Sequence, residues 1–308
     1  MKIRKGATKT WKVLKKTAAE FNEDNAIKLS ASLAYYTIFS IAPLSIIILS
    51  LCGVFFGEDA VNGQFYGQIK NLVGNQAAIQ IQETIKNMEL NHNNVFAMTV
   101  GIVILLVGAS GVFAEIQSSI NYIWGLRAKP KRGLSKFLLN RLMSFSMIGV
   151  MGFILLVSLV ANTILDLISD ELIGFLPNAT VYLLYGLNLG VVLAIITLLF
   201  AVIFKTLPDG KLAWKDTLIG SGVTAVLFMI GKFGISFYLG TSTVATAYGA
   251  AGSVVIILVW VYYSAIILYF GAEFTKVYAT MYGKSIVPNG YAVTIQKEVF
   301  EIEEDVKS

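Results

Sequence analysis

Four ionisable residues lie inside or at the edge of long apolar segments of this 308-residue sequence: Glu115, Asp166, Lys232 and Glu273. Placing such a group in hydrocarbon costs at least a few kcal/mol unless it meets a partner or water, so each is a candidate functional residue. Lys232 lies about fourteen residues into its segment, or roughly 21 Å along a helix. A cation at that depth would contact an anionic substrate or lipid phosphate, extend to the outer headgroups, or pair with Asp166. The sequence leaves these three interpretations open.

A second group of candidates consists of uncharged polar residues in the apolar segments and one proline. We expect Pro43 to kink or break its helix, and a break in lipid must face protein or water, so Tyr35, Tyr36 and Ser40 should lie with it against the bundle interior. The polar side chains form hydrogen bonds between helices or line a substrate cavity. Residues 186–190, Gly-Leu-Asn-Leu-Gly, are typical of a close-packing seam. The full set is Tyr35, Tyr36, Ser40, Pro43, Asn162, Asn188, Tyr238 and Tyr262.

The sequence contains few of the residues that usually carry out catalysis in enzymes. It contains one histidine, His92, and one cysteine, Cys52, which exclude an internal disulfide and make a zinc site of His and Cys implausible. No cluster of carboxylates or histidines supplies metal ligands or a base for a nucleophile. We therefore expect no enzymatic activity, no metal and no cofactor, and a hydrolase or nuclease in particular is disfavoured.

Six apolar runs predict an all-α membrane protein with six transmembrane helices, because about 20 helical residues cross a hydrocarbon core of about 30 Å. Of the 24 Lys and Arg residues, 21 fall in loops on one side, only Lys70 and Lys86 fall on the other, and Lys232 is within a run. This bias places both termini in the cytoplasm of a bacterial inner membrane, and it accounts for the net charge of +5 without a nucleic-acid partner. The runs are Ser32–Phe56, Val95–Gln117, Leu142–Ile168, Ala179–Phe204, Thr217–Leu239 and Ala251–Thr275.

In this topology the two glutamates reach the cytoplasmic interface, where a charge is tolerated more easily. Glu115 and Glu273 each lie near the end of an apolar run, after about twenty of its residues. We expect them, together with Asn121 and Arg141, to form structural pairs or to act as a cytoplasmic gate or proton site. The basic residues within reach are Arg127, Arg141 and Lys276.

Residues 1–31 are expected to be a cytoplasmic amphipathic segment. Trp11, Leu14, Ala18 and Phe21 recur at helical spacing with lysines between them. This pattern predicts a basic helix that lies on the inner leaflet.

The rest of the chain divides into a membrane domain and a tail. The six-helix domain spans 32–276 and contains one substantial extracytoplasmic segment, 57–94, whose two apolar stripes predict short amphipathic helices across the outer end of the bundle. The polar residues 277–308 form a cytoplasmic tail that we expect to be partly disordered.

Four ordered blocks between about Asn25 and Tyr278 carry a family resemblance. They are Ser32-Leu33-Ala34-Tyr35-Tyr36 with Ser40 and Pro43; Ser119–Trp124; Leu207-Pro208 with Trp214, Asp216 and Gly220; and Tyr248-Gly249 with Trp260–Tyr263 and Gly271–Glu273. With these blocks the chain resembles the YihY/BrkB family, once labelled ribonuclease BN. The resemblance implies a six-helix inner-membrane protein without settled chemistry, for which the ribonuclease label is regarded as a misassignment and export roles, including lipid movement, have been suggested.

Together these observations favour a transporter or a lipid flippase or exporter that moves an anionic lipid or solute through an intramembrane cavity. Membrane lipids are then the expected partners, and the sequence is compatible with a homo-oligomer. The alternative is a non-transporting membrane scaffold or envelope-biogenesis partner, which the small loops and amphipathic ends also fit.

Overall fold

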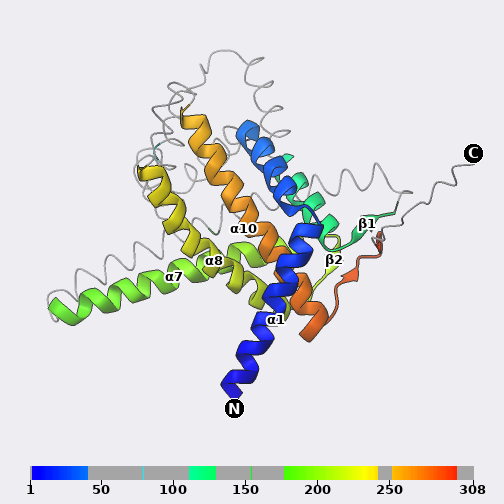
Figure 1. Cartoon of the computed structure of the whole chain (residues 1–308), viewed down its shortest axis with the longest axis horizontal. Coiled ribbons are helices and arrows are strands. Elements are labelled where there is room, and N and C mark those ends of the chain that lie inside the picture. Colours follow the sequence, from blue (N-terminus) through cyan, green and yellow to red (C-terminus); the bar gives the residue numbers. More distant parts are fainter. Residues whose placement is uncertain are drawn as a thin grey trace, which may run out of the picture.

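The computed structural model describes residues 2–40, 79, 111–129, 154, 177–241 and 252–296. Helices dominate this part of the chain (Figure 1). The labelled helices are α1 (Lys2–Glu23), α7 (Pro177–Thr206), α8 (Trp214–Thr241) and α10 (Gly252–Tyr282), and residues 26–40 and 111–123 are also helical.

Three of these helices are long and apolar enough to cross a membrane: Gly186–Thr206, Trp214–Ile235 and Val254–Tyr282. They coincide with the fourth, fifth and sixth predicted spans, which confirms those three as candidate spans. Most of the first three spans and of the 57–94 segment lies outside the described residues, as do Pro43, Arg141, Asn162 and Asp166. The total of six spans and the position of the termini therefore stay predictions.

The antiparallel pair of α8 and α10 is held by small residues that let the two helices approach closely. A side chain at Gly220 would overlap Thr275, and one at Gly271 would overlap Thr224. Both threonines donate a hydrogen bond to a carbonyl one turn earlier in their own helix, which satisfies the buried hydroxyls. The seam predicted at 186–190 is not seen among the described residues, because a Cβ on either glycine there meets nothing within 4 Å.

Helix α1 lies against the C-terminal half of α10 (Figure 1). The face of α1 that packs includes Val13 and Thr17, which are buried, and Leu14 and Phe21 of the predicted stripe pack beside them, whereas the Trp11 side chain is 69% exposed. Val13 joins an apolar cluster with Phe274 and Val277 of α10. Glu20 and Asp24 follow about two and three turns after Val13 on the same face, so the segment presents carboxylates to α10 as well as a valine.

Asn25 ends α1 and starts the helix over 26–40. Its φ of 51° lies in the left-handed region, which asparagine tolerates better than most residues with a side chain. The backbone nitrogen of Asn25 donates to the backbone carbonyl of Asn22, and the backbone carbonyl of Asn25 accepts from the backbone nitrogen of Lys28. This turn keeps Asp24 buried at the end of α1.

Short strands occur among the described residues, which the expectation of an all-α protein did not include. Strand β1 (Leu126–Ala128) pairs antiparallel with β4 (Ala292–Thr294), and β2 (Gly210–Lys211) pairs with β3 (Val287–Pro288). The helix α10 runs on to Tyr282, and residues up to 296 are described, so the first part of the predicted tail is ordered. The physical reason is that backbone pairing satisfies polar groups of segments that are distant in sequence.

These pairings gather, at one end of the bundle, the segments that the charge bias assigns to the cytoplasm. The backbone nitrogen of Asn289 donates to the carbonyl of Asp209, and Ile295 donates to Gly125. The main apolar core lies beside them and includes Ile120, Phe204 and Tyr269, each fully buried. This end of the molecule therefore joins residues from α1, 111–129, the α7–α8 connection, α10 and the chain that follows it.

Candidate functional site at the contact between α1 and α10

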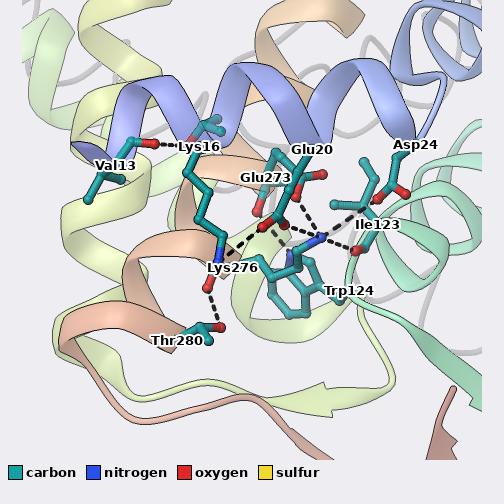
Figure 2. Close-up of polar contacts among 11 residues, drawn as sticks. Val13, Lys16, Glu20, Asp24, Ile123, Trp124, Glu273, Lys276 and Thr280 are labelled. Atoms are coloured by element: carbon teal, nitrogen blue, oxygen red, sulfur yellow. Dashed lines mark hydrogen bonds and ion pairs between the residues drawn. The ribbon is translucent and has the colours of Figure 1, made fainter. Parts of the chain in front are cut away.

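The ammonium group of Lys276 is the centre of the most extensive polar cluster in the described part of the chain (Figure 2). It lies 2.6 Å from Glu273 Oε1, 2.9 Å from Glu20 Oε2 and 3.6 Å from Asp24 Oδ2. It also donates a hydrogen bond of 2.8 Å to the carbonyl oxygen of Ile123. One cation thus links α1, α10 and the end of the 111–123 helix.

Helical spacing brings these side chains together. Glu273 and Lys276 are three residues apart on α10, and Glu20 and Asp24 are four residues apart on α1, so each pair shares one helix face. The indole nitrogen of Trp124 donates to the carbonyl of Ala272, 3.0 Å away, and fixes the 111–129 segment against α10 beside the cluster. The arrangement depends on three segments at once.

The Glu273 side chain is buried more deeply than its partners. Glu273 is 0% exposed, whereas the Glu20 side chain is 22% exposed. Its Oε1 lies against Lys276, and its Oε2 accepts no hydrogen bond from any donor that the structure describes. Lys16 lies 3.5 Å from the other oxygen of Glu20, at the exposed edge of the cluster.

Glu20 and Glu273 compete for the same ammonium. Their nearer oxygens are at most about 5.5 Å apart because both touch Lys276, and two negative charges at that separation repel by roughly 3 kcal/mol at an effective dielectric constant of about 20. A proton on one of the two carboxyl groups would remove this repulsion and turn that group into a hydrogen-bond donor.

Glu20 is the ionised member of the pair. Burial raises the pKa of the Glu20 carboxyl, but the hydrogen bonds from Lys276 and Glu273 and the charges of Lys276 and Lys16 outweigh it, so the pKa lies below its usual value.

A cavity of about 280 Å³ adjoins the cluster and gives solvent a route to part of it. Glu20, Asp24 and Lys276 line this cavity, whereas Glu273 does not. The other lining residues are Glu23, Ile123, Trp124, Gly125 and Ile295.

A second polar arrangement involves the predicted residue Asn121. Its amide nitrogen and that of Gln117 donate to the two carboxylate oxygens of Asp209, at 3.0 and 3.2 Å, and its amide oxygen accepts from the backbone nitrogen of Asp209 at 2.8 Å. A cavity of about 450 Å³ lies beside them, with Arg127 at its wall. Because Asp209 is buried and clasped by two amides, we interpret Asn121 as a structural clamp between 111–129 and the α7–α8 connection.

The expected charge pairs are confirmed only in part. Glu273 pairs with Lys276, one of the three basic residues considered for it. Glu115 forms no ion pair within the described ranges, and Arg127 lines the cavity beside Asp209. Glu20 and Asp24 were missed, although the spacing of Val13, Thr17, Glu20 and Asp24 marks one face of α1.

The proposed substrate-binding residues do not gather into one cavity where the structure describes them. Lys232 is half-buried on α8 and lines neither of the two cavities described above. Its neighbour Gly231 contacts the hydroxyl of Tyr263. Lys232 therefore lies at the level of Tyr262 and Tyr263 on α10. That level is roughly 20 Å along α10 from Lys276, counting about thirteen residues. Asn188 and Tyr238 are exposed.

The described part of the first span places Ser40, Tyr35 and Tyr36 differently. Ser40 is buried, but Tyr35 is 61% exposed and Tyr36 is also exposed. Tyr36 and Ser40 both lie beside Gly111, whereas Tyr35 contacts the rings of Tyr36 and Phe39. Because Pro43 and most of the first three spans lie outside the described residues, the orientation of these side chains toward the bundle interior stays a prediction.

Comparison with known proteins gives one consistent result. A family model described as virulence factor BrkB matches residues 17–292. Relatives named UPF0761 membrane protein occur in Saccharophagus degradans (26% identical, 84% of this chain and 58% of the relative), Methylibium petroleiphilum (27%, 84% and 60%) and Vibrio vulnificus (24%, 83% and 79%). The chain thus spans less than two thirds of the length of the first two relatives. No solved structure matches it.

Proposed function

Because the chain belongs to the BrkB family of membrane proteins, we propose that it is a multi-pass transporter of the bacterial inner membrane that moves an anionic lipid or solute. The contact between α1 and α10 is its cytoplasmic gate. The protein performs no chemical conversion, and Lys232 in α8 supplies the positive charge that attracts the substrate.

The observation that carries this proposal is the charge cluster at the end of an otherwise apolar helix. Replacing a buried ion pair by well-packed apolar residues is often neutral or stabilising, so a contact that served only to hold α1 on α10 would not need Glu273, Glu20 and Lys276. A polar contact has a different property: when it opens, water solvates the separated charges. The free-energy difference between the closed and the open state is therefore smaller for an interface of this kind than for an apolar interface.

A reversible cross-link between the two helices tests the gate. Val13 and Val277 belong to one apolar cluster across this interface, so cysteines at both positions in a Cys52→Ser background are within reach of a short bifunctional thiol reagent that a reductant cleaves. Reconstituted into proteoliposomes with fluorescent anionic lipids or a trapped anionic solute, the cross-linked protein should lose transport and regain it on reduction. The two single-cysteine variants treated in the same way are the controls.

Two results would overturn the proposal. If the cross-linked protein moves its substrate as fast as the reduced one, the α1–α10 contact is not the gate. If the folded, uncross-linked protein moves neither lipids nor solutes of either charge, transport itself is wrong, and the scaffold function becomes the better explanation. Separate assays with lipid in the bilayer and solute in the lumen distinguish the two substrate classes.

A further inference from the structure

We propose that the cluster at the α1–α10 contact is a proton-binding site, in which one exchangeable proton resides on Glu273 and is shared with Glu20. The proton closes the gate when it binds and opens it when it leaves. Its role in gating rests on the proposed transport function, whereas its binding to Glu273 does not.

The groups that face Glu273 explain why it holds a proton. From α1 come the carboxylates of Glu20 and Asp24, and from its own helix comes the single ammonium of Lys276. From the 111–129 segment the group that reaches the cluster is the carbonyl oxygen of Ile123, which also takes a hydrogen bond from Lys276. Ionised Glu273 would therefore meet two other carboxylates and a carbonyl around a cation that it does not hold alone.

The position of the proton follows from burial and hydrogen bonding. Glu273 is fully buried and its Oε2 meets no donor, so this oxygen gains nothing from a negative charge. Glu20 has an ammonium group at each oxygen, Lys16 at Oε1 and Lys276 at Oε2. A protonated Glu273 donates to Glu20, which satisfies both carboxyl groups with a single proton.

The cavity supplies the route for exchange. Glu20 lines the cavity and Glu273 does not, so a proton passes from cavity water to the Glu20 carboxylate and from there to Glu273, and it leaves in the reverse order. No covalent bond other than O–H changes, and no other reactant is needed. Glu20 is thus the relay and Glu273 the storage site.

The coupling to conformation has a definite sign. The closed contact binds one proton more than an open contact in which Glu273 is hydrated and ionised, so a fall in pH favours closure and a rise in pH favours opening. In the pH range in which Glu273 is ionised in the open form but protonated in the closed form, the ratio of closed to open molecules changes by up to about tenfold per pH unit.

The direct test is infrared difference spectroscopy on the full chain in lipid nanodiscs, without any substrate. Wild-type protein at neutral pH should show the carbonyl stretch of a buried protonated carboxyl group, which shifts in heavy water and disappears at alkaline pH. Glu273→Gln should lack this band. Glu23→Gln is the matched control, because Glu23 lines the same cavity but is exposed, and it should keep the band.

A second readout follows the contact itself. Spin labels on the exposed positions Asn22 and Thr280, in a Cys52→Ser background, should report a separation of α1 and α10 that increases with pH in wild type. The same labels in Glu273→Gln should report one pH-independent distance, that of the closed contact, because glutamine is a permanent mimic of the protonated acid. Wild-type titration decides the question even if the Glu273→Gln variant does not fold.

The outcomes separate the two proposals. The absence of a buried carboxyl band in wild type at every pH, or its persistence in Glu273→Gln, overturns the proton site whatever the transport assays show. A band that behaves as expected, with label distances that ignore pH, overturns the gating role. A proton site together with a protein that transports nothing removes the proposed function and leaves the site intact.

Discussion

Removing the ammonium of Lys276 should destabilise the protein more than any other single substitution in the α1–α10 contact. At an effective dielectric constant of about 20, the ion pair of Lys276 with Glu20, at 2.9 Å, has a gross attraction of roughly 6 kcal/mol, most of which offsets the loss of hydration. Breaking a buried pair by deleting one partner typically costs about 3–5 kcal/mol, because the remaining charge is left uncompensated. For Lys276→Met we expect the free energy of unfolding to fall by about 3 kcal/mol, the lower end of this range. The proton on Glu273 reduces the negative charge that is left without a partner.

The double variant Lys276→Met/Glu273→Gln gives the sharper measurement. Lys276 and Glu273 are in direct contact, so the effects of the two changes should be strongly non-additive, and the double variant should lose less stability than the sum of the two single losses. Thermal unfolding of purified protein in one detergent measures all variants, with Lys15→Met on the exposed face of α1 as the control for loss of a lysine. If Lys276→Met unfolds at the wild-type temperature, or if the two substitutions are additive, the cluster is not the coupled electrostatic unit described above.

Two further predictions concern packing and acid stability. Gly220→Ala should destabilise the protein by about 1–3 kcal/mol, because the new methyl group overlaps the buried Thr275 side chain, whereas Gly222→Ala, which meets nothing within 4 Å, should be neutral or slightly stabilising; equal unfolding temperatures would show that the close approach is dispensable. The lowered pKa of Glu20 contributes stability that is present above the ordinary glutamate range and is lost as pH falls through the lowered value. Unfolding measured against pH should therefore show a smaller acid-side loss for Glu20→Gln than for wild type, and parallel curves would contradict this.

The sequence predicted the parts of the fold that depend on local composition. Continuous apolar runs mark the helices α7, α8 and α10, and the structure places each within a few residues of the expected span, although α10 continues to Tyr282. Glu273 and Lys276 were recognisable as partners because three residues on a helix separate them. Periodicity and spacing carry this information without knowledge of the tertiary contacts.

The rest depends on contacts between distant segments. Strands of two or three residues, such as β1 and β4, have no periodicity of their own, and they form because their backbones meet. Glu20 and Asp24 look like ordinary surface carboxylates on a basic helix, and only the packing of α1 on α10 brings them to Lys276. The apolar stripe of α1 marks only part of the packed side: Leu14 and Phe21 pack inward, but Glu20 and Asp24 also face α10.

One face of α1 carries both apolar side chains and carboxylates, and only the carboxylates respond to pH. Val13 packs against Phe274 and Val277 through contacts that do not depend on pH, and beyond the Asn25 turn the 26–40 helix contributes Leu33 to the main core. Glu20 and Asp24 lie between these two apolar attachments. Under the proposed gating, a change in the charge of the cluster acts on the middle of this segment, and opening of the contact also requires Val13 to separate from Val277.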